Sequence, residues 1–273
     1  PRIMGIVNVT PDSFSDGGCF FDPGAAAVHA QALVAAGADI LDIGGESTRP
    51  GAEPVSEAEE IRRVVPAIRA IRALGDTPVS IDTMKPAVAS AAMAAGAAIW
   101  NDVTALAFAP ESLATAADLG CDVVLMHMRG EPRTMQREPF ARNALRDVTS
   151  GFRRALAVAR RAGMPKSQIV LDPGLGFGKS TAQNYELLAQ LPQLARLGCP
   201  LLVGPSRKKF IGKVLGDAPS GERVWGTAAT VAAAILAGAH IVRVHDLVEI
   251  VQVARVADAI LDPRLAAKAA RRA

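Results

Sequence analysis

The feature that most constrains the fold is a regular alternation of two kinds of segment. Eight short runs rich in Val, Ile and Leu occur along the chain, and each has the length and composition of a buried β-strand. These runs begin at Arg2, Ala38, Pro78, Ala98, Asp122, Gln168, Pro200 and His240. Alanine-rich amphipathic stretches separate them, one of which follows a predicted Ser56/Glu59 capping box. Strand and helix are therefore expected to alternate eight times.

Eight strand and helix units in 273 residues predict a (β/α)8 TIM barrel, because such barrels commonly need about 250 residues around a single core. The alternative is a doubly wound open sheet of eight strands. Half of the residues are hydrophobic, and no linker or low-complexity stretch interrupts the alternation. We therefore expect one domain over residues 1–273, with a peripheral tail after about residue 263.

Charge and cysteine content narrow the class of protein. A net charge of +3, from 30 basic and 27 acidic residues, is too small to predict binding to nucleic acid or to a membrane surface. Cys19, Cys121 and Cys199 are widely spaced and odd in number, which favours neither disulfides nor a zinc site. The longest apolar run is too short to span a bilayer, and the first strand pattern begins without a secretion signal. We expect a cytoplasmic protein.

Polar residues close almost all of the strand runs. In a barrel, the carboxyl ends of the strands form one mouth, where catalytic groups collect. One such residue alone could equally cap a helix or contact solvent, but a set that converges on one face favours a ligand site. The set consists of Asn8, Asp42, Glu46, Asp82, Asn101, His127, Asp172, Ser206, Lys208, Arg243 and His245.

Three of the loops after these strands exceed the usual length of about 2 to 6 residues. They read TPDSFSDGGCFFDP, GESTRPGAEPVS and RGEPRTMQREPFARNA. Each mixes polar or charged residues with Gly and Pro, which is typical of a lid over a charged substrate. A flexible exposed loop is the alternative.

The stretch GLGFGKST, residues 174–181, is similar to a phosphate-binding loop but lacks its spacing. The motif G-x-x-x-x-G-K-[ST] requires a glycine where Pro173 stands. We interpret the stretch as a tight turn that leaves Asp172 directed into the mouth.

Eight motifs follow one another along the chain: NVTPDSFSDGG, GGESTRPG, SIDT, NDV, LMHM, LDPGLGFGK, GPSRKKFIG and RVHD. Their order and spacing closely resemble those of the dihydropteroate synthases, transferases of folate biosynthesis, from Arg2 to about Asp262. Enzymes of this family join p-aminobenzoate to 6-hydroxymethyl-7,8-dihydropterin diphosphate, forming 7,8-dihydropteroate and releasing diphosphate. The resemblance implies this reaction and a pterin pocket inside the barrel.

By motif match, the resemblance also implies the residues that bind the pterin, which are Asp82, Asn101, Met126, Asp172, Phe177 and Lys208. Asp172 would accept hydrogen bonds from the amino group and the adjacent ring N–H, since a carboxylate offers two acceptors to two donors. The thioether of Met126 and the aromatic ring of Phe177 would enclose the flat pterin. Met126, however, could equally fill the core.

Diphosphate binding is implied for Asn8, Arg49, Arg243 and His245, because the anion needs positive charge and hydrogen-bond donors. Asn8 resembles the family's ligand to Mg²⁺, with Asp12 as a second ligand. A carboxamide oxygen and a carboxylate suit this ion, which takes phosphate oxygens and water for the rest of its shell.

The resemblance implies a p-aminobenzoate pocket formed by Phe14, Thr48, Pro50 and Lys209, in which sulfonamides would compete. Two positions depart from the family pattern. Lys209 stands where serine or arginine is frequent, and Trp100 stands where a smaller aliphatic residue is common. Strand alternation should direct Trp100 outward, towards the helices.

The residues expected to act in catalysis are Asp82, Asp172, Lys208, Arg243 and His245. Stabilised diphosphate would leave before the amine attacks, and the two aspartates would stabilise the resulting pterin methylene cation. No nucleophilic residue is needed, and no general base is assigned, since water or diphosphate could take the proton.

Three alternatives lack support in the motifs. A pterin-dependent methyltransferase would not need the NVTPDSFSDGG and STRPG loops, and a silent pterin-binding protein would be expected to lose Asn8, Arg49, Lys208 or His245. A sugar-phosphate barrel enzyme would carry a glycine-rich phosphate-binding segment after the last two strands.

The stretch WGTAATVAAAILAGA is apolar on nearly every face, which, with the resemblance, implies a homodimer through the late helices.

Overall fold

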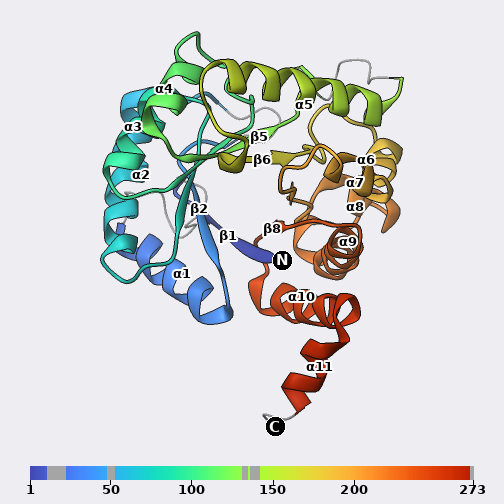
Figure 1. Cartoon of the computed structure of the whole chain (residues 1–273). Helices are drawn as coiled ribbons and strands as arrows, with labels where there is room; N and C mark the ends of the chain where they lie inside the picture. The colour runs from blue at the N-terminus through green and yellow to red at the C-terminus, as the bar shows by residue number, and fades with distance from the viewer. Residues whose placement is uncertain (11–22, 48–52, 131–134, 136–141, 271–273) are drawn as a thin grey trace.

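Eight parallel strands form a nearly closed barrel in the computed structural model, which describes residues 1–10, 23–47, 53–130, 135 and 142–270 (Figure 1). The strands are β1 (Arg2–Asn8), β2 (Ile40–Gly44), β3 (Val79–Asp82), β4 (Ile99–Asp102), β5 (Asp122–Met126), β6 (Ile169–Asp172), β7 (Leu202–Val203) and β8 (Ile241–Val244). They pair in the order β6-β5-β4-β3-β2-β1-β8-β7. A single parallel bridge between Leu171 and Leu201 joins the two ends. The predicted barrel is confirmed, and the open sheet is not found.

The helices lie around the strands (Figure 1). They are α1 (Pro23–Ala36), α2 (Glu57–Arg72), α3 (Pro86–Ala94), α4 (Ser112–Leu119), α5 (Ala144–Arg161), α6 (Thr181–Ala189), α7 (Leu191–Ala195), α8 (Lys209–Val214), α9 (Val224–Leu236), α10 (Leu247–Leu261) and α11 (Pro263–Ala270), with short 3-10 turns at Lys166–Gln168 and Ser220–Glu222. Figure 1 shows α11 projecting away from the barrel. Within the described ranges, no helix combines the length and the apolar character needed to cross a membrane.

The helix starts follow the sequence signals only in part. Ser56 accepts a hydrogen bond from the backbone N–H of Glu59 at 3.3 Å, but the Glu59 carboxylate pairs with arginines of its own helix rather than reaching back. The capping box predicted there is therefore half formed. A complete box, which was not predicted, opens α6 at Ser180 and Gln183.

The core has two layers. Inside the barrel, a small cluster contains Met4, Ile40, Val124, Leu202 and Ile241. A much larger cluster lies between the strands and the helices, and it includes the fully buried Trp100. The indole N–H of Trp100 donates to the carbonyl of Thr83 at 2.7 Å. The outward direction predicted for Trp100 is confirmed, and its neighbour Asn101 consequently faces the barrel interior.

Candidate active site

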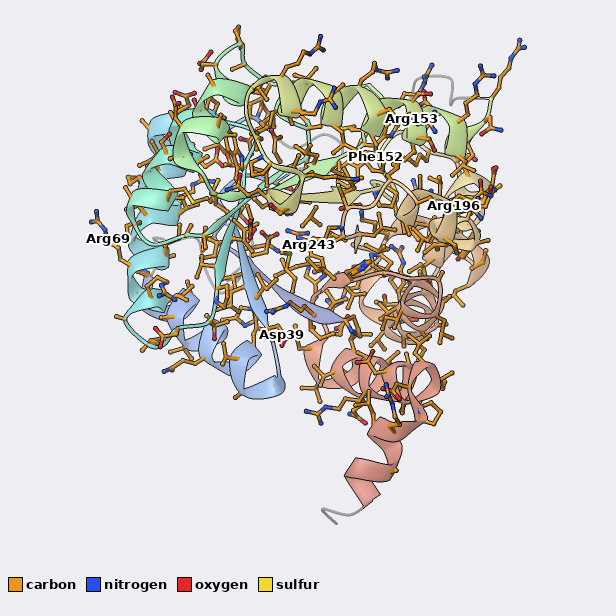
Figure 2. All side chains as sticks on the ribbon, in the orientation of Figure 1. Asp39, Arg69, Phe152, Arg153, Arg196 and Arg243 are labelled. Carbon is orange, nitrogen blue, oxygen red and sulfur yellow. The ribbon has the colours of Figure 1, made fainter. Side chains whose placement is uncertain are left out.

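Three strands bring their polar ends together around Arg243 of β8. Figure 2 shows the Arg243 side chain near the centre of the barrel. Its Nη2 donates to Asp82 Oδ2 of β3 at 2.7 Å, and its Nε donates to Asp42 Oδ2 of β2. Asn101 Nδ2 of β4 donates to the same Asp42 oxygen at 3.0 Å. Residues far apart in the chain thus form one hydrogen-bonded cluster.

The charges in this cluster are unequal, because one guanidinium faces two buried carboxylates. Burial raises the pKa of Asp82 to about 7, although Arg243 opposes this shift and Asp42 adds to it. Burial also disfavours the charge of Arg243, but Asp42 and Asp82 outweigh it and raise the Arg243 pKa. The Oδ1 atoms of Asp42 and Asp82 are buried and accept no hydrogen bond from the described residues. They are acceptors suited to N–H donors of a flat heterocycle.

Asp172 and Lys208 form the other side of the mouth. Asp172 closes β6, and its Oδ1 accepts a hydrogen bond from Gly174 N at 2.7 Å. Lys208 Nζ donates to the carbonyl of Leu175 and lies 4.4 Å from the centroid of the Phe177 ring. Burial raises the pKa of Asp172, and the charge of Lys208 opposes this rise. Burial also lowers the pKa of Lys208 to about 8, and the charge of Asp172 opposes this fall. The pair offers an acceptor and a donor beside an aromatic face.

His245 lies just beyond the end of β8 and is oriented by Ser206, which follows β7. Its Nδ1 is 2.9 Å from Ser206 Oγ, and its backbone N–H donates to the same oxygen at 3.1 Å. Arg207 holds Asp246 through two hydrogen bonds in the adjoining turn. These contacts fix the position of the His245 ring relative to β8 and Arg243.

Asn8 ends β1 next to this cluster. It pairs in register with Gly44, which in turn pairs with Asp82. A Cβ built on Gly44 would lie 3.9 Å from Asn8 Oδ1 and 3.8 Å from Asp82 Oδ2. The side chains of Asn8 and Asp82 therefore both lie next to Gly44, on the same face of the barrel.

Met126, the last residue of β5, pairs in register with Asp172 and is almost fully buried. Because register neighbours in parallel strands face the same side, its side chain points inward with Asp172. The next residue, His127, then points outward. Its ring packs edge-to-face on Phe152 of α5, and burial lowers its pKa to about 4. His127 does not join the mouth cluster, contrary to its grouping with the other strand ends.

Other predicted residues lie elsewhere. Lys209 is exposed and opens α8. Glu46 pairs with Lys85, which also pairs with Glu60 of α2, so its carboxylate belongs to a separate buried network. The predicted site residues that belong to the loops lie outside the described residues: Asp12, Phe14, Thr48, Arg49 and Pro50.

Asp42 was named among the strand ends but given no role, and the structure puts it beneath Arg243. The signal was present in the sequence. Ile40 and Asp42 are two positions apart on one strand and therefore share a face, and Ile40 belongs to the cluster inside the barrel. An acidic residue on the inward face of a barrel strand needs a partner, and Arg243 provides it.

The described residues offer few ligands for a resident metal ion. Among the described residues, no group of three or more His, Cys, Asp or Glu is placed to hold a metal ion. Of the two expected ligands, Asn8 ends β1 at the mouth, and Asp12 lies outside the described residues. The amide oxygen of Asn8 is a ligand of the kind that suits Mg²⁺, which keeps several waters and takes further oxygens from a phosphorylated substrate.

A barrel with buried carboxylates at its mouth agrees with the match of residues 4–245 to the family described as pterin binding enzyme. The dihydropteroate synthase of Synechocystis sp. is 51% identical over 258 residues, which cover 94% of this chain and 89% of that protein. The chain therefore belongs to the dihydropteroate synthases, as the motif resemblance predicted.

Solved structures give the same result. The dihydropteroate synthase of Yersinia pestis in complex with a sulfonamide drug matches with a TM-score of 0.90 and 46% identity, covering 95% of this chain and 94% of that chain. The enzyme of Xanthomonas albilineans with 4-aminobenzoic acid matches with a TM-score of 0.90 and 47% identity, covering 96% and 93%.

Proposed function

We infer that this chain is a transferase that condenses 6-hydroxymethyl-7,8-dihydropterin diphosphate with p-aminobenzoate to give 7,8-dihydropteroate and diphosphate. The observation that carries this inference is the match of almost the whole chain to a dihydropteroate synthase at 51% identity. The Xanthomonas relative holds 4-aminobenzoic acid and the Yersinia relative a sulfonamide drug. These ligands support the same second substrate and the same class of inhibitor for this chain.

The pterin ring binds in the mouth, with its donor edge on Asp172. Asp82 and Asn101 meet the opposite edge, and Lys208 donates to the ring nitrogen and carbonyl. The geometry supports these roles, because the four side chains come from the ends of neighbouring or facing strand segments. Asn101 and Asp172 are buried, and Asp82 and Lys208 are partly buried. Met126 is paired in register with Asp172 and the Phe177 ring lies under the Lys208 ammonium, and these positions support the proposal that the two side chains enclose the flat ring.

The diphosphate lies at the side of the mouth formed by β1 and β8. Arg243 and His245 supply donors there, and Arg49 is the expected third cationic group. Asn8, with Asp12 as the expected helper, would hold a Mg²⁺ ion carried in with the substrate. When bound, this ion neutralises charge on the diphosphate.

The charge placement favours a dissociative reaction. The C–O bond between the pterin methylene and the diphosphate breaks, and the electron pair leaves with the diphosphate held by Arg243 and His245. Asp82 and Asp172 stabilise the methylene cation through their negative charge. The amine of p-aminobenzoate then forms the C–N bond and loses its proton to water or to diphosphate. No covalent enzyme intermediate is required.

The second substrate binds at the outer end of the mouth. Phe14 and Pro50 form apolar walls for its ring, with Thr48 and Lys209 beside it. Sulfonamides occupy the same space, because they share the aromatic amine. Growth of a cell that depends on this enzyme should therefore be inhibited by a sulfonamide, and unimpaired growth would contradict this part of the proposal.

The decisive experiment measures diphosphate release from the dihydropterin diphosphate and Mg²⁺, with and without p-aminobenzoate. Release that depends on p-aminobenzoate and yields dihydropteroate is expected from the wild type and from Lys213→Ala, which changes an exposed lysine of α8. Asn8→Ala and Lys208→Ala should lose it. Pterin binding without turnover in the wild type would refute the inferred reaction.

The proposal includes a single-domain homodimer in the cytoplasm. Trp225 of α9 is 75% exposed, and Val256 and Ile260 of α10 are each 62% exposed. These side chains border one apolar hollow between the two helices, and burying them against a second copy would remove this surface from water. Light scattering of Trp225→Glu should show monomers where the wild type shows dimers; a monomeric wild type would refute the assembly.

A further inference from the structure

Lys179 follows the glycine-rich turn after β6, and its side chain is almost entirely buried. Its Nζ donates to three backbone carbonyls: His127 O at 3.0 Å, Gly174 O at 2.9 Å and Phe177 O at 2.9 Å. An ammonium group has three N–H donors, so these carbonyls use them all. Burial lowers the pKa of Lys179 to about 7, although Asp172 opposes the shift. A charged group is thus kept in a costly environment.

The three carbonyls belong to two different loops. His127 follows β5, whereas Gly174 and Phe177 belong to the turn after β6. The two loops approach so closely that a Cβ on Gly174 would lie 2.0 Å from His127 O, and one on Gly178 would lie 2.3 Å from Arg129 O. Besides the backbone hydrogen bond from His127 N to Asp172 O, Lys179 therefore adds a side-chain connection between the exits of β5 and β6, at a point where only glycine fits.

The same turn carries the contacts that hold the pterin side of the mouth. Gly174 N donates to Asp172, the Leu175 carbonyl accepts from Lys208, and the Phe177 ring lies under the Lys208 ammonium. None of these three contacts involves the Lys179 side chain itself. Lys179 makes no hydrogen bond to Asp172 or Lys208. It acts on them through the backbone of the turn and, at longer range, through its charge, which opposes the rise of the Asp172 pKa. Its donors are already taken, so it does not act as a phosphate ligand.

We propose that Lys179 is a positioning residue for the synthase reaction: it fixes the turn at residues 174–178, and the turn in turn holds Asp172 and Lys208 in the geometry that binds the pterin ring. This inference rests on the proposed function. In this role, the lysine of the GLGFGK stretch positions the turn, whereas the lysine of a phosphate-binding loop contacts phosphate.

The test compares Lys179→Met, which keeps the length of the side chain and removes the donors, with Lys166→Met. Lys166 is an exposed lysine before β6, at the opposite end of that strand. Calorimetry with 6-hydroxymethylpterin should show affinity reduced by about tenfold or more in Lys179→Met, as loss of a charge-assisted hydrogen bond predicts. The KM for p-aminobenzoate at saturating pterin substrate should change by no more than about twofold. Lys166→Met should match the wild type.

A purely structural role would give a different result, because it would lower stability and active fraction while leaving the pterin affinity of the folded protein unchanged. That outcome would overturn the proposal. If Lys179→Met does not fold, Lys179→Gln, which keeps two N–H donors, serves in its place, with a loss of about threefold or more expected. A wild type that neither binds the pterin nor turns over would instead refute the proposed function.

Discussion

Replacing Gly174 with alanine tests how closely the loops after β5 and β6 are packed. The new Cβ would lie 2.0 Å from the carbonyl oxygen of His127 and 3.1 Å from its carbonyl carbon. Both are backbone atoms, so no side-chain rotation can relieve the contact. The turn must move by about 1 Å to restore van der Waals separation, and the hydrogen bonds of Gly174 with Asp172 and Lys179 must lengthen.

Gly163, at the end of α5, provides a matched control. Its φ of +84° is in the same left-handed region as the +65° of Gly174, but no heavy atom lies within 4 Å of an added Cβ. Gly163→Ala therefore measures the backbone strain alone, about 1 kcal/mol. Gly174→Ala adds the loss of two hydrogen bonds at about 1 to 2 kcal/mol each, so a total of about 3 to 5 kcal/mol is expected.

Urea unfolding followed by circular dichroism, at one fixed protein concentration, measures both free energies. We also expect Gly174→Ala to weaken pterin binding by about tenfold or more, because the turn holds Asp172 and Lys208, while Gly163→Ala leaves binding intact. Equal destabilisation by the two substitutions would refute the close approach of the loops. It would also refute the explanation that Gly174 is required because a larger residue would collide with the His127 carbonyl.

Three further predictions concern charged groups. Lys85→Met leaves the carboxylates of Glu46 and Glu60 without their shared cation, and should cost about 3 to 5 kcal/mol of unfolding free energy; loss below 1 kcal/mol would show that the network contributes little. Since the folded pKa of His127 is about 4 against an ordinary value of 6.5, its contribution to stability is complete above pH 6.5 and is lost as the pH falls towards 4. His127→Leu should flatten the Tm profile in that window, and an unchanged slope would contradict the assignment. Arg243→Met should reduce kcat by about 10² or more through loss of leaving-group stabilisation, and a change confined to the KM for p-aminobenzoate would argue against that role.

The barrel could be predicted because its signal is periodic and local. Each buried strand is a short apolar run, and the alternation of faces within it placed Trp100 correctly among the helices and Asn101 inside. The same alternation, applied strictly, would have directed His127 outward and given Asp42 a role. His127 was misplaced because every polar residue at a strand end was assigned to the mouth. Asp42 was assigned to the mouth correctly but was given no partner.

Other contacts have no signal in a single sequence. Lys85 meets Glu46 and Glu60 only because β2, α2 and the loop after β3 pack together, and nothing in their spacing indicates this. Lys179 binds backbone carbonyls, whose positions depend on the turn geometry rather than on residue type. The ligand roles assigned to the mouth residues, and those of the loop residues Arg49 and Phe14, stay predictions.

The pairing of Arg243 with two aspartates has a consequence for selectivity. Among the mouth residues that the structure describes, the three carboxylates Asp42, Asp82 and Asp172 face the two cations Arg243 and Lys208, so this part of the site is not a strong attractor for anions in general. A free inorganic anion must compete with Asp82 for the Arg243 N–H group. A diphosphate attached to a pterin arrives with the binding energy of its ring, and can compete where phosphate alone cannot. We therefore expect the carboxylates to disfavour the binding of simple anions at this site.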